Sequence, residues 1–584
     1  MKLLQFAVWA PLLALVGCAQ QPVQPVAPQP KQPAAKAPAP KPRVAVRPPA
    51  TPRALPNQEL SKALLFKLLV ADIALQRGQV NVAVQSFLEL ARETKDPRVA
   101  QRATEVAWNA RFVGGALEAA GIWLAAEPES MQARQILAAL LVNQSRLAEA
   151  QPHLETWLAA DPENIGHNLL QLNGLLARHP DKAAVLQLTQ NLAEPYPKMP
   201  EARYSIAQAA LNASRSALAR DEVRAALALR PEWEQAALFQ GQLLQRQSNA
   251  DALAYYETFL KSHPGAMDVR LNYARLLVTD QKYAEARNQF QALVKAFPDN
   301  PDVTLAVGLL SLQLKDFDAA EVQLLRALAT NHKDPDLVRL YLGQANEERQ
   351  RFDEALRWYG IIRSSTHYVP ARTRSAKILA KQGKLAEARK YLQASGQNAQ
   401  QRVQFIQAEA QLLREENDYR GAYEVLDQAL EKNPASPELL YDHAMAAEKI
   451  GRIDVLEANL RRVIEIKPDH AHAYNALGYT LADRNTRLPE AYALIQHALK
   501  IAPQDPFIMD SMGWVLYRMS QHDAALTFLK RAFELRPDAE IAAHLGEVLW
   551  VAGQRDEARR VWDSALKLSP ANEVLLATVK KFSP

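Results

Sequence analysis

The stretch from Asp510 to Pro537 alternates apolar and polar positions with the period of an α-helix, and it does so twice. The pattern predicts one helix from about Phe507 to Met519 and a second from about Asp523 to Leu535. Pro537 ends the second helix, because a proline ring has no N–H with which to continue it. The stretch therefore forms two helices joined by a short turn.

The small residue at Ala525 recurs along the chain, at steps of 33 to 35 residues from Ala116 to Ala422 and again from Ala525 to Ala558. The series comprises Ala116, Ala150, Ala184, Ala219, Ala252, Ala286, Ala320, Ala355, Ala388, Ala422, Ala525 and Ala558. A run of prolines repeats with the same step, at Pro434, Pro468, Pro503, Pro537 and Pro570. Such a long internal period predicts about fifteen helix-turn-helix units between Leu60 and Pro570, followed by a last helix from about Asn572 to Phe582.

A glycine inside the first helix of several units completes the pattern. Glycine in a helix interior is less favourable than alanine by about 1 kcal/mol, so Gly513 makes sense only where a second helix packs closely over it. These residues, in this order, resemble the tetratricopeptide signature, whose repeat is about 34 residues long. The resemblance implies an all-α superhelical solenoid over residues 59–570 and a C-terminal capping helix within 571–584. The residues expected to pack where helices cross are Ala320, Ala355, Gly478, Gly513, Ala525, Gly546 and Ala558.

Three regions depart from the regular unit and are predicted to be looser joints. Between Gly166 and Met199 the interior glycine is absent and prolines bracket the second helix. Between Tyr359 and Asn433 other residues replace the terminal prolines, and between Pro437 and Pro468 a leucine, Leu456, replaces the packing alanine. The length of 584 residues thus counts repeats rather than separate globular domains.

Residues 1–17 have a basic start at Lys2 and an apolar run too short to span a bilayer comfortably, which is the layout of a secretory signal. The single cysteine of the chain, Cys18, follows directly. The sequence Leu15-Val16-Gly17-Cys18 resembles a bacterial lipobox, which implies cleavage before Cys18 and lipidation of its thiol. The alternative is an uncleaved anchor helix with an incidental cysteine. Ala19 stands where an inner-membrane retention signal would have aspartate, so the resemblance favours the periplasmic face of the outer membrane.

The following segment, to residue 58, is rich in proline and carries basic residues only. Its composition predicts an extended tether that buries too little apolar surface to fold. Removing Lys2 and the six basic residues of the tether from the net charge of +5 leaves −2 for residues 59–584. The basic charge either keeps the tether solvated or contacts anionic head groups or cell wall. Nothing in the folded part suggests nucleic-acid binding.

Motifs for catalysis, nucleotide binding or metal binding are lacking in the sequence. His470 and His472 lie at a repeat junction, where starting a helix is the better interpretation than a metal site. The chain is therefore expected to be no enzyme and to need no cofactor or metal.

In tetratricopeptide arrays the first helices line the inner surface, where partners bind. The resemblance implies that ten residues of the last units bind a partner. For each of them the alternative is an aromatic ring packed in the core or a solvated charge. The ten are Tyr441, Asp442, Asn475, Tyr479, Asp510, Trp514, Arg518, His544, Glu547 and Trp550. An apolar first helix, containing Leu65, Leu69 and Ile73, is expected to pack into the core rather than to offer a face to a partner.

The lipobox, the tether and the long repeat array together resemble one family of proteobacterial outer-membrane lipoproteins. The motifs are NALGYTLADR at 475–484, DSMGWVLYR at 510–518 and EIAAHLGEVLW at 540–550. The family is typified by the lipoprotein binding partner of the carboxyl-terminal processing protease. The resemblance implies an adaptor without activity of its own, which holds a periplasmic serine protease near the outer membrane and helps to deliver or activate that protease against cell-wall hydrolases. A scaffold for pilus or polysaccharide export is the alternative; a fused enzyme is a third possibility, for which the repeats leave no room.

Overall fold

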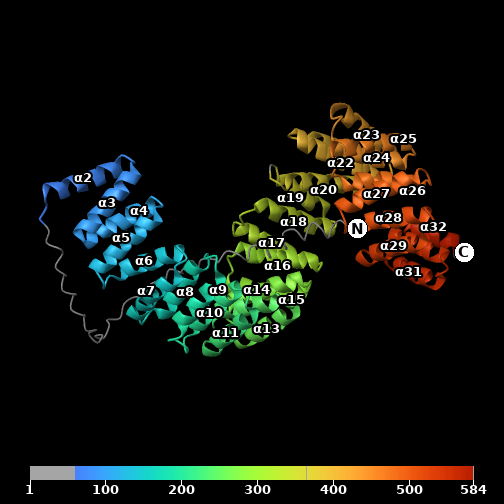
Figure 1. Cartoon of the computed structure of the whole chain (residues 1–584). Coiled ribbons are helices and arrows are strands. Elements are labelled where there is room, and N and C mark those ends of the chain that lie inside the picture. The colour runs from blue at the N-terminus through green and yellow to red at the C-terminus, as the bar shows by residue number, and fades with distance from the viewer. Residues whose placement is uncertain (1–58, 364, 583–584) are drawn as a thin grey trace. The chain divides into compact units, whose positions relative to one another are not determined.

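The structure, a computed structural model, describes residues 59–363 and 365–582 (Figure 1). The signal segment, the lipobox residues Leu15, Val16 and Gly17, Cys18 and the tether lie outside the described residues. By its internal contacts the chain divides into two compact units, the first ending at Gln323 and the second beginning at Leu324.

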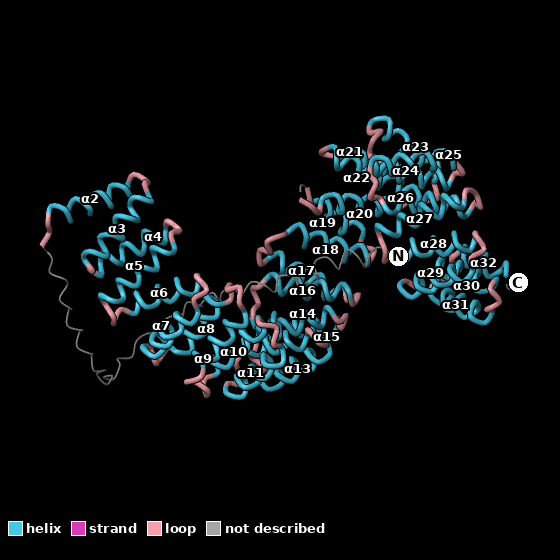
Figure 2. Tube along the Cα trace, in the orientation of Figure 1, coloured by secondary structure: helices cyan, strands magenta, loops and turns pink. Residues whose placement is uncertain are grey.

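Helices account for all regular structure in the described residues, and no strand occurs among them (Figure 2). The first unit contains α2 (Lys62–Gln76), α3 (Val80–Thr94), α4 (Pro97–Asn109), α5 (Val113–Ala126), α6 (Met131–Asn143), α7 (Leu147–Ala160), α8 (Ile165–Leu176), α9 (Lys182–Ala193), α10 (Pro200–Asn212), α11 (Ser216–Leu229), α12 (Glu234–Gln245), α13 (Asn249–Ser262), α14 (Met267–Thr279), α15 (Tyr283–Ala296) and α16 (Pro301–Gln313). The boundary between the units falls within α17 (Phe317–Ala329).

The second unit continues the same alternation of helix and short turn. It contains α18 (Pro335–Glu348), α19 (Phe352–Ile361), α20 (Tyr368–Lys381), α21 (Leu385–Ser395), α22 (Ala399–Glu415), α23 (Tyr419–Lys432), α24 (Pro437–Lys449), α25 (Ile453–Ile466), α26 (Ala471–Asp483), α27 (Leu488–Ile501), α28 (Pro506–Arg518), α29 (His522–Leu535), α30 (Ala539–Val551), α31 (Arg555–Leu568) and α32 (Glu573–Phe582). The described helices thus form fifteen pairs and a last single helix, and the predicted all-α fold class is confirmed.

The pair α28/α29 shows how the sequence sets the ends of each helix. Asp505 precedes α28 and accepts hydrogen bonds from the N–H groups of Phe507 and Ile508 at 2.8 and 3.1 Å. Such a cap satisfies donors that have no partner within the helix. The turn after α28 passes through Ser520 with a left-handed φ of 63°, and α29 ends before Pro537. Local chemistry therefore explains the predicted bounds of both helices.

Small residues lie where the two helices of a pair cross. Ala525 of α29 is fully buried, and a Cβ atom added to Gly513 of α28 would lie 3.1 Å from the Ala525 carbonyl oxygen. Among the other predicted packing residues, a Cβ on Gly478 would lie 2.9 Å from a backbone oxygen, and Ala320, Ala355 and Ala558 are fully buried. Close approach of the two helices is what requires glycine, or a residue with only a methyl group, at these crossings.

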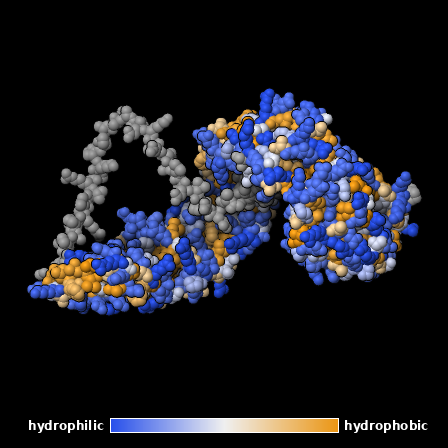
Figure 3. All heavy atoms as spheres, turned by 90° about the horizontal axis from the view of Figure 1, so that it is seen from above, coloured by the Kyte–Doolittle hydropathy of each residue, from blue (hydrophilic) through white to orange (hydrophobic). Residues whose placement is uncertain are grey.

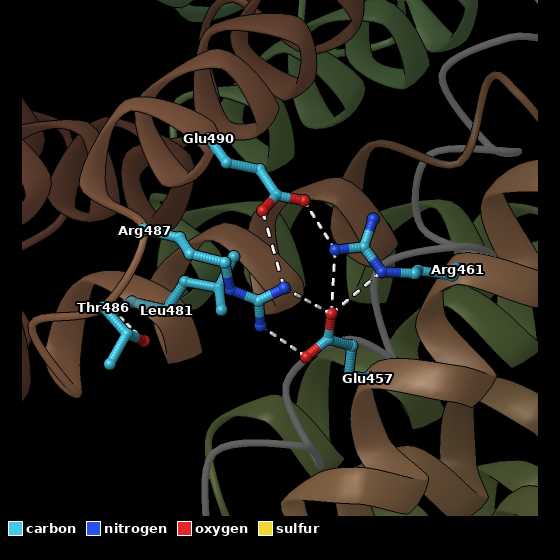
Figure 4. A network of polar contacts seen from close by, with 6 residues as sticks. All are labelled: Glu457, Arg461, Leu481, Thr486, Arg487 and Glu490. Carbon is cyan, nitrogen blue, oxygen red and sulfur yellow. Dashed lines mark hydrogen bonds and ion pairs between the residues drawn. The ribbon is translucent and has the colours of Figure 1, made fainter.

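Second helices of neighbouring pairs are also joined by ion pairs. Glu457 and Arg461 of α25 meet Arg487, which precedes α27, and Glu490 of α27 (Figure 4). Arg487 and Arg461 lie 2.5 Å from Glu457 and Glu490 respectively, and both arginines contact Glu457. The pKa of Glu457 is lowered to about 2, mainly because its carboxylate accepts hydrogen bonds from Arg487, while burial acts in the opposite direction.

Candidate functional site

The ten residues predicted to face a partner all lie on first helices of the second unit. Tyr441 and Asp442 are on α24, and Asn475 and Tyr479 are on α26; Asp510, Trp514 and Arg518 are on α28, and His544, Glu547 and Trp550 are on α30. Helix α28 packs against both α26 and α30. The three first helices therefore bring their side chains to one surface.

Four of the ten residues form a connected group, the His544 cluster: Tyr479, Asp510, Trp514 and His544. The imidazole Nδ1 of His544 lies 2.9 Å from Asp510 Oδ2, and its Nε2 lies 3.4 Å from the Tyr479 hydroxyl. The Trp514 ring stacks on the imidazole, with ring centres 4.3 Å apart. Each of the three helices thus contributes to the cluster, which links them side by side.

Most of the His544 cluster is buried. Asp510 and Trp514 are each 6% exposed, and the Trp514 indole N–H has no acceptor among the described residues. Tyr479 and His544 are only partly exposed to solvent. Packing between repeats is therefore one role of this cluster, and only its outer edge is open to a partner.

The charges around His544 favour its protonated form. Burial is the largest single influence and lowers the pKa of His544, but the carboxylates of Asp510, Glu540 and Glu547 together outweigh burial and raise this pKa. A protonated His544 donates to Asp510 and to Tyr479 at once.

Carboxylates outnumber cations around Tyr479, where His544 and, beside Glu448, Lys449 carry the positive charge. Burial, followed by the charges of Asp483, Asp510, Glu540 and Glu448, raises the pKa of Tyr479. Burial likewise raises the pKa of Glu448, with Asp483 and Glu540 adding to the effect. Within the described part of the chain, Glu448, Asp483 and Glu540 form no ion pair. Surplus negative charge of this kind attracts cationic groups and repels anionic ones.

Glu547 is held from two sides by residues that the sequence did not single out. Its carboxylate accepts a hydrogen bond from the Tyr517 hydroxyl and pairs with Lys581 of α32, each at 3.3 Å. Tyr517 follows Trp514 by three residues on one helix face, so its role was visible in the helical spacing. Lys581 had no such signal, because its contact depends on where α32 packs.

The remaining predicted residues lie outside the His544 cluster or at its edge. Trp550 packs on Trp562, with ring centres 5.7 Å apart, and on Phe582. Asp442 accepts a hydrogen bond from Gln407 at 2.7 Å. The other contacts are Tyr441 beside the His470 ring at 5.2 Å, Arg518 over the Trp514 ring at 5.9 Å, and an Asn475 Oδ1 that is buried and accepts no hydrogen bond among the described residues.

The N-terminal first helix, α2, departs from expectation. Hydrophobic side chains gather on the surface at this end of the first unit (Figure 3), and Leu65, Phe66, Leu69 and Ile73 of α2 are 43 to 68% exposed. The expectation that this helix packs wholly into the core is therefore wrong. Later first helices such as α4 and α6 pack against the second helix of the pair before them, whereas no described helix precedes α2.

The described residues were compared with the requirements of a metal site and of a membrane-spanning helix. They contain no group of three or more histidine, cysteine or acidic side chains arranged to hold a metal ion. None of the helices from α2 to α32 combines the length and apolar character needed to cross a bilayer. His470 instead accepts a hydrogen bond from the Ala473 N–H at the start of α26, which confirms its interpretation as a helix-starting residue.

Comparison with known proteins identifies the repeat. The tetratricopeptide repeat family model matches residues 242–301, 274–337, 408–455, 441–506 and 511–573. The TPR repeat-containing protein PA4667 of Pseudomonas aeruginosa is 32% identical over 492 residues, which cover 83% of this chain and 82% of that protein. The chain belongs to the tetratricopeptide-repeat family. Repeats of this family form protein interaction scaffolds and are typically not catalytic, so the surfaces described above are those of a scaffold.

Two more distant likenesses extend over parts of this tetratricopeptide-repeat chain. The cellulose synthase operon protein C of Pseudomonas fluorescens is 23% identical over 299 residues, which cover 48% of this chain and 23% of that protein. Among solved structures, Naa15/Naa10 bound to HypK-THB matches 89% of this chain and 96% of the matched chain, at 12% identity and a TM-score of 0.37.

Proposed function

We propose that the protein is a lipid-anchored adaptor on the periplasmic face of the outer membrane. It binds a carboxyl-terminal processing serine protease and positions or activates that protease for degradation of cell-wall hydrolases. The observation that carries the proposal is that all 31 described helices belong to the repeat array, so the whole described chain is scaffold. The similarity to a TPR repeat-containing protein over most of the chain supports the same conclusion.

Two features of the chain fit an adaptor. A lipidated Cys18 and a basic proline-rich tether would keep the scaffold near the membrane while leaving it free to move. Tethering of this kind raises the effective concentration of two bound proteins to about the millimolar range. The exposed apolar face of α2 is a surface of the kind that marks protein interaction sites.

A capture experiment tests the adaptor function. The mature chain is used as bait in detergent-solubilised envelope, beside a bait in which Phe66→Ser and Leu69→Ser remove the exposed apolar face. Leu568→Ser provides the matched control, because Leu568 of α31 is 67% exposed and Phe66 is 68% exposed. We expect the processing protease with the unchanged bait and with the control, and its loss with the double variant. The proposal is contradicted if none of the three baits captures the protease.

The second candidate function is a scaffold in an envelope assembly or export complex. The partial similarity to a cellulose synthase operon protein favours it. Recovery of polysaccharide-export or pilus components by the same bait, in place of a protease, would select this candidate. Both candidate functions include the lipid anchor. When cells are fractionated, the Cys18→Ser variant should be found in the soluble periplasm instead of the outer membrane.

A further inference from the structure

Four apolar side chains are exposed at the first two turns of the first unit. Val80 and Val82 follow the turn after α2, and Trp108 and Phe112 flank the turn after α4; the four are 37 to 53% exposed. Among the tryptophans of the described chain, Trp108 has the most exposed side chain. Apolar residues scattered singly over a surface are ordinary, whereas a group of them indicates contact with a partner or a membrane.

The two turns lie at one edge of the array. Short connections reverse the chain between α3, α4 and α5, so α3 and α5 run in the same direction, and these two helices are in contact. Each of them begins at the turn of its own pair. A Cβ atom added to Gly115 would overlap both the Phe112 ring and a methyl group of Leu88, so this ring lies close to α3. Hydrophobic side chains gather on the surface at this end of the first unit (Figure 3).

Arginine is the only charged residue type at these turns. Residues 73–88 contain Arg77, residues 106–117 contain Arg111, and neither stretch contains an acidic residue. Both arginines are exposed, and neither forms an ion pair within the described chain. Four neighbouring arginines do pair with carboxylates: Arg92, Arg98, Arg102 and Arg146. The positive charge at the turns is therefore left for an anion outside the chain. The exposed residues together are named the turn patch: Arg77, Val80, Val82, Trp108, Arg111 and Phe112.

We propose that the turn patch docks on an anionic lipid surface. A tryptophan ring suits the boundary between head groups and acyl chains, because its body is apolar and its N–H can donate to a head group. An arginine stem lies along apolar surface while its guanidinium group pairs with lipid phosphate. Apolar side chains beside cations, without any carboxylate, thus match both layers of a membrane surface.

The place of the turn patch in the chain favours a membrane over a protein partner. The tether from Cys18 leads directly into α2, so the first two pairs follow the proposed lipid anchor. At about 3.1 Å per residue the tether alone would let the array move on the order of 100 Å from the membrane. Even weak docking would be effective, because the anchor keeps the turn patch at high local concentration near lipid. The inference rests on the anchored location in the proposed function and adds a contact that holds the first pairs at the membrane.

A fluorophore on a single cysteine tests the docking. Cys18 is the only cysteine of the sequence, so the full mature chain with Cys18→Ser takes one label at Asn109→Cys. Asn212→Cys is the matched control: Asn109 ends α4 and Asn212 ends α10, both helices have 13 residues and begin with proline, and both asparagines are exposed. The probe is a vesicle of phosphatidylethanolamine and phosphatidylglycerol that contains lipids with nitroxide-labelled acyl chains. Such lipids quench a fluorophore only on contact.

We expect a blue shift and quenching of the label at Asn109→Cys, and neither at Asn212→Cys. Arg77→Gln with Arg111→Gln should weaken the titrated partition about thirtyfold, because each arginine near an anionic surface contributes about fivefold. The control with the same loss of charge is Arg215→Gln with Arg246→Gln. Both residues are exposed arginines beside the turns of α10/α11 and α12/α13, and their replacement should change the partition at most about twofold.

Equal quenching at both label positions, or none at Asn109→Cys, would overturn the docking. An equal loss with both arginine pairs would show that net charge alone binds the protein to the vesicle, which also contradicts the role of the turn patch. Loss of the processing protease from the bait with Arg77→Gln and Arg111→Gln, with unchanged quenching, would make the patch a protein site and overturn lipid docking. The labelled chain carries no lipid and meets no protease, so its failure would leave the anchor to the fractionation experiment and the adaptor function to the capture experiment.

Discussion

Gly546 in α30 gives the sharpest test of how the pairs pack. A Cβ atom at this position would lie 1.9 Å from Nε1 and 2.3 Å from Cε2 of Trp562. The Trp562 ring has little room to move, because it is 1% exposed and stacks on both Trp550 and Phe582. Gly546→Ala therefore has two opposing effects: it raises helix propensity, and it places a methyl group where the rigid Trp562 ring lies.

The two effects differ in sign, and their sizes decide the outcome. Alanine gains about 1 kcal/mol over glycine in a helix interior. Overpacking a tight core costs about 1–3 kcal/mol, and an overlap this deep belongs at the upper end. We expect Gly546→Ala to lower the local stability of α30 and α31 by about 1–2 kcal/mol. Gly121→Ala, in open space, should instead raise stability by up to about 1 kcal/mol.

Native-state hydrogen exchange read by mass spectrometry is the suitable assay. Repeat arrays unfold in sections, so a local opening free energy is better defined than one global value. Faster exchange confined to α30, α31 and their neighbours, with slower or unchanged exchange for Gly121→Ala near α5, is the expected result. Equal or greater protection in Gly546→Ala would show that α30 and α31 do not approach as described.

Three further predictions concern the second unit. Ala525→Leu should overpack the crossing over Gly513 and lower the urea midpoint by an amount equivalent to about 1–3 kcal/mol; an unchanged midpoint would contradict the register. The pKa of His544 is raised in the folded protein. Its pairing with Asp510 therefore stabilises the folded state fully at pH values below the unfolded pKa of about 6.5, and this stabilisation is lost as the pH rises through the folded pKa. The urea midpoint should fall over that range, and His544→Gln should flatten the profile. Because the folded pKa of Glu457 is lowered from 4.5 to about 2, its contribution is present above 4.5 and is lost as pH falls toward 2. Allowing for its partial exposure and solvent screening, Glu457→Gln should lose about 1 kcal/mol at pH 7 in low salt and less in 1 M salt.

Sequence periodicity predicted the helices well because each unit carries its own local signals. Caps such as Asp505, terminal prolines and the small residues at crossings act within one pair or its neighbour, so their spacing along the chain determines their spacing in the structure. The positions of Gly513 and Ala525 followed directly from this regularity.

The candidate site was harder to predict. The spacing of residues along a helix shows on which face of the helix a side chain lies, but not whether another helix covers that face. Placement of Trp514 and Asp510 on one face was predictable, whereas their burial depends on His544 from the next pair. The exposure of Leu69 could not be read from α2 alone, since similar residues are covered when a pair precedes them.

The adaptor function is tested most directly by reconstituted proteolysis. Purified processing protease is mixed with a cell-wall hydrolase, and cleavage is followed with and without the purified mature protein, which is also tested alone. The account predicts no cleavage by the mature protein alone, faster cleavage by the protease in its presence, and loss of this gain with Phe66→Ser and Leu69→Ser but not with Leu568→Ser. Cleavage by the mature protein alone, or an unchanged protease rate at saturating concentrations of the mature protein, would contradict it.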